Sequence, residues 1–118
     1  MHELSIGSAV VDTAVKHAAG RRVSLVSVRL GHLRQVVPDS LSFYFDLIAR
    51  DTVCEGARLE WEIVPARLCC EPCSHEWDVT EPAFRCPRCD GARVVVLSGE
   101  ELEVASIEVH QEEPACIV

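Results

Sequence analysis

The chain has 118 residues, enough for one ordinary domain or for a small domain with a lobe held together by a metal ion. It carries 19 acidic and 11 basic side chains, a formal net charge of -8, and a single lysine, Lys16. This balance argues against nonspecific binding to a nucleic-acid backbone, which needs clustered lysine and arginine. No apolar run reaches the roughly twenty residues that a membrane span requires.

The amino-terminal part of the chain predicts a helix followed by a strand. Apolar residues at three- and four-residue steps predict an amphipathic helix that ends before Gly20. Apolar residues at two-residue steps over 23–30 then predict a half-buried strand, and 31–37 is expected to be a loop. The expected buried face of the helix consists of Leu4, Ser8, Val11, Val15 and Ala18, with Val10 and Ala14 beside them.

A second helix and two more strands follow. Pro38-Asp39-Ser40 is typical of a helix start. Leu59, Trp61 and Ile63 alternate with charged residues and predict a strand with one solvent-exposed face. The residues from 102 to 109 predict the last strand, so the fold class is α+β: a small three-stranded sheet with two helices and an inserted zinc-binding lobe. The expected domains are 1–65 with 98–111 and the lobe 66–97, and residues 112–118 form a flexible tail.

The lobe is predicted from two short cysteine hooks, Cys70-Glu71-Pro72-Cys73 and Cys86-Pro87-Arg88-Cys89, with twelve residues between them. Two such hooks supply four thiolates, the ligand set of a closed tetrahedral zinc site. A full thiolate shell leaves no position for substrate, so zinc is expected to be structural. Two disulfides, four free thiols, or iron bound as in rubredoxin are the alternatives.

Other cysteines and histidines have weaker signals. Cys69 is expected to be a small apolar packing residue that could substitute for Cys70. His75 follows the first hook and is expected to be solvated or to lie beside the ligands, with zinc ligation as the alternative. The cysteine pattern, without a basic and apolar leader, favours the cytoplasm, where thiols stay reduced.

The start of the chain predicts a second metal site. The amine of Met1, the amide nitrogen of His2 and the imidazole of His2 can close adjacent chelate rings in one plane. Tetragonal nitrogen coordination suits Ni(II) or Cu(II) better than zinc. The alternative is a solvated histidine on a mobile terminus.

These features occur in an order that resembles the HypA family of nickel metallochaperones, which act in the maturation of nickel–iron hydrogenases. The resemblance covers nearly the whole chain, and its most specific elements are the Met1-His2-Glu3 start and the position of the two hooks. It implies a nickel site at the amino terminus, with His2 as the essential ligand and the Met1 amine and the Glu3 region completing the shell. Asp39 matches an acidic position near that site, and it could equally favour the start of its helix.

The resemblance also implies partners and a function. Nickel is expected as transient cargo and zinc as a structural ion. The partners would be a HypB-type GTPase and a hydrogenase large-subunit precursor, with urease maturation as a related role, and the chain would be a monomer or weak homodimer. The sequence contains no recognisable arrangement of a nucleophile with a general base and no glycine-rich phosphate-binding loop, so an enzyme is not expected. The alternative function is a zinc-ribbon module that binds protein or nucleic acid, in which His2 is incidental.

Overall fold

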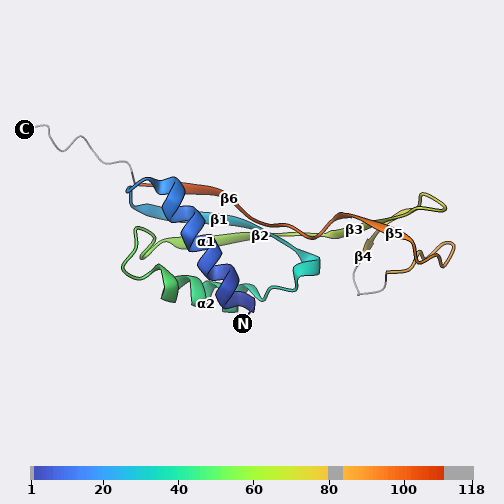
Figure 1. Cartoon of the computed structure of the whole chain (residues 1–118), viewed down its shortest axis with the longest axis horizontal. Coiled ribbons are helices and arrows are strands. Elements are labelled where there is room, and N and C mark those ends of the chain that lie inside the picture. The colour runs from blue at the N-terminus through green and yellow to red at the C-terminus, as the bar shows by residue number, and fades with distance from the viewer. Residues whose placement is uncertain (1, 80–83, 111–118) are drawn as a thin grey trace, which may run out of the picture. The chain divides into compact units, whose positions relative to one another are not determined.

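The computed structural model describes residues 2–79 and 84–110 (Figure 1). Two three-stranded sheets, with the strand orders β2-β1-β6 and β4-β3-β5, accompany two α-helices. The predicted fold class is confirmed, although the second sheet, inside the lobe, was not predicted. The elements are α1 (His2–Ala18), β1 (Val23–Gly31), the short 3-10 helix η1 (His32–Arg34), α2 (Pro38–Ala49), β2 (Arg58–Val64), β3 (Ala66–Cys70), β4 (Glu76–Val79), β5 (Val94–Ser98) and β6 (Leu102–Val109).

The chain divides into two compact units. Unit 1 takes the described residues of Met1–Val28, Val37–Trp61 and Val104–Val118, and unit 2 takes those of Arg29–Val36 and Glu62–Glu103. The segment that contains η1 therefore belongs to the same unit as the cysteine hooks, although it precedes α2 in the chain. Neither helix α1 nor α2 combines the length and apolar character needed to cross a membrane.

Helix α1 buries a stripe of small and branched side chains. Its buried positions are Ile6, Gly7, Val10, Val11, Ala14 and Ala18. The predicted face was wrong at Leu4, Ser8 and Val15, which are exposed. The stripe is rotated because Gly7 lets the two helices approach closely: a Cβ at this position would lie 3.2 Å from Ile48 Cδ1.

Helix α1 ends with an arginine cap. The Arg21 side chain donates from Nε to the Ala18 carbonyl at 2.8 Å and from Nη2 to the His17 carbonyl at 3.3 Å. These bonds satisfy two of the carbonyls that lack partners at the end of a helix. Ala19 and Gly20 follow with φ of 51° and 84°, a left-handed conformation that glycine adopts freely. The predicted helix end before Gly20 is therefore confirmed.

The core of unit 1 combines the buried face of α2 with strand β1. Leu41, Phe45 and Ala49 are the buried residues of α2, at the spacing of one helical face. Along β1, Val26 and Val28 are buried, whereas Ser27 between them is only half-buried. One face of β1 is thus covered and the other is partly open to solvent.

Strand β2 is less buried than its sequence pattern predicted. Leu59 is half-buried, but Trp61 and Ile63 keep 39% and 44% of their surface exposed. Strand β2 lies at an edge of its sheet, because it pairs only with β1 in the order β2-β1-β6. An edge strand has a neighbour on one side only, which explains why its apolar residues are incompletely covered.

Unit 2 has a small apolar core. Ala66, Leu68 and Val79 are its buried members, and the half-buried side chains of Leu33, Trp77, Val94 and Val96 pack against them. Leu68 on β3 pairs with Trp77 on β4 and with Val96 on β5, in antiparallel registers. A core of this size cannot offset the entropy of ordering the segment by itself, so a metal ion is expected to contribute much of the folding free energy.

Within unit 2, the segment around η1 makes close backbone contact with the residues after β5. The N–H of Gly31 donates to the Glu101 carbonyl at 2.6 Å, and the N–H of Leu33 donates to the Gly99 carbonyl at 2.8 Å. A Cβ on Gly31 would collide with the Gly99 carbonyl. The φ of Gly31 is -70°, which any residue can adopt, so glycine is needed here for space alone.

We expect Gly31→Ala to destabilise the protein by about 2 kcal/mol or more, because the added methyl forces backbone apart. Gly56→Ala is the control: nothing lies within 4 Å of its Cβ position, and only the φ of 80° opposes the substitution. That strain should cost about 1 kcal/mol. Urea unfolding of the zinc-loaded proteins measures the loss of unfolding free energy in each variant. Equal losses in Gly31→Ala and Gly56→Ala would contradict the steric argument.

Candidate metal centres

The first hook is a tight turn closed by two backbone hydrogen bonds. Cys70 is the last residue of β3, and its carbonyl accepts the N–H of Ser74 at 2.7 Å. The N–H of Cys70 donates in turn to the His75 carbonyl at 2.8 Å. Ser74 has a φ of 60°, which turns the chain back toward β4. The turn brings the sulfurs of Cys70 and Cys73 to one side.

The second hook repeats this pattern. The N–H of Asp90 donates to the Cys86 carbonyl at 2.8 Å, and the N–H of Cys86 donates to the Gly91 carbonyl at 3.0 Å. Asp90 has a φ of 58°, nearly the value at Ser74. The two hooks therefore have the same local backbone geometry, although their sequences share little beyond the cysteines.

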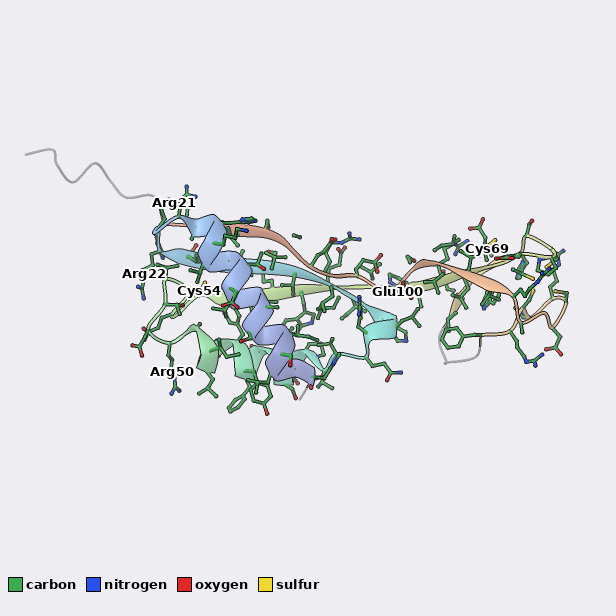
Figure 2. The ribbon with its side chains drawn as sticks, viewed as in Figure 1. Arg21, Arg22, Arg50, Cys54, Cys69 and Glu100 are labelled. Carbon is green, nitrogen blue, oxygen red and sulfur yellow. The ribbon has the colours of Figure 1, made fainter. Side chains whose placement is uncertain are left out.

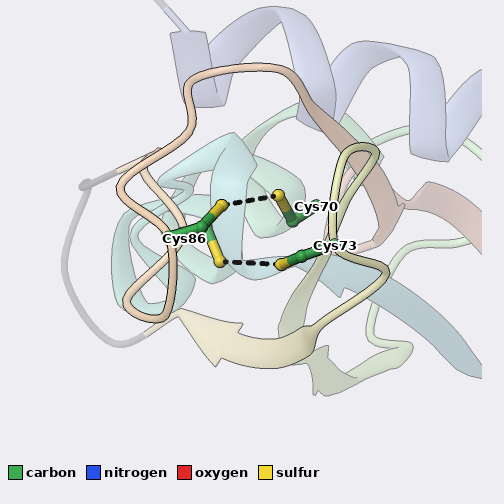
Figure 3. Close-up of side chains that lie close together, drawn as sticks. Cys70, Cys73 and Cys86 are labelled. Carbon is green, nitrogen blue, oxygen red and sulfur yellow. Dashed lines mark hydrogen bonds between the residues drawn. The ribbon is translucent and has the colours of Figure 1, made fainter.

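The four hook thiols face one another (Figure 3). All four sulfur atoms lie within 4.8 Å of one another, with Cys70–Cys89 at 3.5 Å and Cys73–Cys86 at 3.6 Å. A tetrahedral zinc ion with Zn–S bonds of about 2.3 Å sets sulfur–sulfur separations of about 3.8 Å. The donor set and its spacing thus fit one zinc ion held by these four cysteines, as the hooks predicted.

The neighbouring groups shift the pKa values of two thiols of the cluster, Cys70 and Cys86, in opposite directions. The N–H of Cys73 favours the Cys70 thiolate, but burial and the neighbouring thiols outweigh it and raise the pKa of Cys70 to about 12. Burial opposes ionisation of Cys86, yet the backbone N–H groups of Cys89 and Arg88 and the adjacent thiols lower its pKa to about 7. Without metal, Cys86 is therefore the first of these two thiols to ionise.

Cys69 and His75 lie beside the cluster without joining it. Side chains alternate along β3, so Cys69 lies on the opposite face of the strand from Cys70, and it is half-buried. Figure 2 labels Cys69 within the lobe. It pairs with Glu76 across the sheet. The imidazole of His75 stacks on Trp77, with ring centroids 5.7 Å apart and an angle of 11° between the planes. The four-thiol group includes neither residue.

Gly91 is a residue that the sequence analysis missed. A Cβ at this position would lie 3.2 Å from Cys89 Sγ and 3.6 Å from Cys70 Sγ, so any side chain here would press on the ligands. The preceding Asp90 has a carbonyl that accepts a hydrogen bond from Arg85 at 3.0 Å. The Asp-Gly pair directly after the second hook is a turn signal that could have identified the position.

The predicted nickel residues lie at the starts of the two helices of unit 1. His2 is the first described residue of α1 and is exposed, and Glu3 follows in the same turn and is half-buried. Glu3 Oε2 accepts the N–H of Val37, the residue before α2, at 3.2 Å. This N–H lowers the pKa of Glu3, against a smaller opposing effect of burial. Asp39 lies in the first turn of α2 and is exposed.

The structure does not gather these residues into a preformed ligand cluster. Over residues 2–79 and 84–110, only the four hook cysteines form a group of three or more ligand atoms spaced for a metal. Met1, predicted to contribute its amine, lies outside the described residues. The contact from Glu3 to Val37, 34 positions along the chain, had no signal in the sequence.

We expect Cys73→Ala to remove the zinc ion and unfold unit 2 locally, because metal binding there supplies folding free energy. Cys69→Ala, four positions earlier and outside the cluster, is the matched control and should retain one zinc per chain. Metal analysis gives the stoichiometry, and hydrogen exchange of β3 to β5 reports the local order. Full zinc occupancy in Cys73→Ala would contradict the proposed ligand set.

Zinc binding should also release protons in a pH-dependent way. The pKa of Cys86 is lowered to about 7, so this thiol is mostly ionised at pH 8 and mostly protonated at pH 6. Zinc must displace that proton at the lower pH, so the number released should rise by about one between pH 8 and pH 6. The apparent zinc affinity should fall more steeply below pH 7. Calorimetry in buffers of different ionisation enthalpy measures the protons, and a constant number would refute the assignment.

The amino-acid sequence matches a family model and several known proteins over most of its length. The family model described as "Hydrogenase/urease nickel incorporation, metallochaperone, hypA" matches residues 1–109. A hydrogenase maturation factor HypA of Streptomyces avermitilis is 50% identical over 112 residues, covering 91% of this chain and 86% of the relative. The HypA of Geobacter metallireducens is 46% identical over 109 residues, covering 92% and 99%.

A solved structure shares the fold. The solution structure of the nickel metallochaperone HypA from Helicobacter pylori matches with a TM-score of 0.69, covering 95% of this chain and 100% of its own. The identity is 24%, so this match supports the fold alone. The family model and the two relatives, which cover nearly the full length, show the family: the chain belongs to the HypA family of metallochaperones for nickel incorporation into hydrogenase and urease.

Proposed function

We propose that this chain binds Ni(II) at its amino terminus and delivers it during the maturation of nickel–iron hydrogenase, with urease as a related client. The observation that carries the proposal is that α1 begins at His2, whose side chain is exposed. The first four amides of an α-helix lie outside the ladder of hydrogen bonds between turns. The His2 amide can therefore lose its proton to a metal without breaking that ladder.

The proposed nickel shell is built from nitrogen. The Met1 amine, the His2 amide and the His2 imidazole would supply three donors in one plane, the geometry that Ni(II) accepts and that structural zinc does not need. Glu3 and Asp39 lie at the starts of α1 and α2 and add negative charge beside the cation. Because the site uses the end of the chain, ligand exchange with a client protein requires no opening of a packed core.

The proposed activity is ligand exchange on protein surfaces, without covalent turnover. The partners would be a GTPase of the HypB type and a hydrogenase large-subunit precursor, in the cytoplasm, with the chain a monomer or weak homodimer. The alternative, a zinc-ribbon module for nucleic acid, is disfavoured by the net charge of -8 and the single lysine. The closed thiolate shell of the lobe would keep zinc as a structural ion while nickel moves.

The test is nickel calorimetry on cleanly processed protein. His2→Ala removes the imidazole without touching the buried stripe of α1, so nickel binding should fall at least a hundredfold while zinc content and thermal stability stay unchanged. His17→Ala is the matched control, because His17 is also an exposed histidine of α1 but lies at the opposite end. Equal nickel binding by wild type and His2→Ala would place the site elsewhere.

A further inference from the structure

We propose that Glu3 is a positioning residue of the nickel site: its carboxylate anchors the first turn of α1 to the Val37 amide and does not bind the metal. The inference rests on the proposed function, since it concerns the same site. It assigns to Glu3 a role different from the one that the chain's resemblance to its family implied.

A side-chain hydrogen bond ties the first turn of α1 to the residue before α2. The buried stripe of the helix begins only at Ile6. Of the four described residues before it, His2, Leu4 and Ser5 are exposed and Glu3 alone is half-buried. Ends of helices fray when nothing holds them. The bond from Glu3 Oε2 to the Val37 N–H, at 3.2 Å, therefore anchors the helix within its first turn, ahead of the buried stripe.

Val37 offers a fixed point for this anchor. It is the residue before α2, and its carbonyl already accepts the N–H of Leu41 at 3.0 Å. Pro38 follows at the first helical position, where its ring fixes the backbone angle. Because the N–H of Val37 precedes the helix, it has no acceptor in the ladder of α2. A carboxylate from α1 satisfies it.

An anchored first turn would favour nickel binding by pre-organisation. A chelate that uses the first two residues must hold them in one geometry, and a frayed helix would pay that ordering cost when the metal binds. The carboxylate of Glu3 is committed to Val37, and the ligand atoms of His2, Glu3 and Asp39 do not form a metal-sized group. For Glu3 to become a ligand, it would have to release the anchor.

The test is a cycle of variants at the two ends of the hydrogen bond. Glu3→Gln keeps a side-chain carbonyl of the same length that can accept the Val37 N–H, but a neutral amide is a poor nickel ligand. Glu3→Ala removes the acceptor. Val37→Pro removes the donor and leaves the carboxylate intact; the native φ of -89° is near the proline range, and the side chain is 52% exposed.

Nickel calorimetry should separate anchor from ligand. We expect Glu3→Gln to bind within about threefold of wild type, and Glu3→Ala and Val37→Pro each to bind about tenfold more weakly, as for loss of one hydrogen bond to a charged group. Glu3→Ala with Val37→Pro should be no weaker than either alone, because both remove the same bond. The absorption spectrum of bound nickel should be the same in all variants, since no ligand changes.

Two results would overturn the inference. One is Glu3→Gln binding as weakly as Glu3→Ala, with an altered nickel spectrum and an unaffected Val37→Pro, which would make the carboxylate a ligand. The other is unchanged affinity in Glu3→Ala, which would leave the anchor without a function. If circular dichroism shows that Val37→Pro is misfolded, hydrogen exchange of the Val37 amide in the metal-free Glu3 variants replaces it: fast in Glu3→Ala, slow in Glu3→Gln and wild type.

Running His2→Ala in parallel distinguishes this inference from the proposed function. Full nickel binding by His2→Ala would contradict the proposed amino-terminal site itself, whatever the results for the Glu3 variants. Loss of binding in His2→Ala with equal losses in Glu3→Gln and Glu3→Ala would retain the site and reject only the anchoring role.

Discussion

Unit 2 depends on four sulfur atoms that must meet at one point. The apolar cluster of its sheet has only three buried members, of which Leu68 is the largest. The first hook forms the connection between β3 and β4, and the second hook precedes β5. Both hooks are therefore attached to strands of the sheet β4-β3-β5. Without a metal, four cysteine sulfurs within 4.8 Å of one another have little mutual attraction. A zinc ion converts that proximity into bonds, and the small core then suffices.

The two metals proposed for this chain differ in the ligand chemistry that would hold them. Soft thiolates in a closed tetrahedron suit zinc, which has no need of an open position. Nitrogen donors in a plane suit nickel, and donors at the start of a helix can exchange without disturbing a core. The separation is therefore chemical: neither ion would fit well in the other's ligand set. Such a difference would let zinc remain in the lobe as a structural ion while nickel is transferred.

Local patterns in the sequence predicted the features that local chemistry determines. The hook spacing identified all four thiols of the cluster, because two residues between cysteines leave few ways to turn the chain. The end of α1 before Gly20 followed from the same kind of signal. The sheet inside the lobe was missed because the short apolar runs on either side of the hooks were interpreted as parts of the metal segment alone.

Contacts between distant residues could not be predicted in this way. The buried stripe of α1 is set by how closely Gly7 lets α2 approach, and periodicity alone placed Leu4 and Val15 on the wrong side. The bond between Glu3 and Val37 joins the starts of two helices and requires the folded unit. The nickel residues were proposed from chelate chemistry and from the chain's resemblance to its family, and the structure adds where their helices begin.

The four sulfurs of the cluster are not equally accessible, and this has a consequence for how the metal would be lost. In each hook the first cysteine is buried and the second is exposed: Cys70 and Cys86 are at most 2% exposed, whereas Cys73 and Cys89 lie at the surface. A chelator or an oxidant such as peroxide would meet the exposed pair first. Damage would thus begin at the outer rim of both hooks together, and the buried pair would hold the last bonds to the ion, which favours recapture over release.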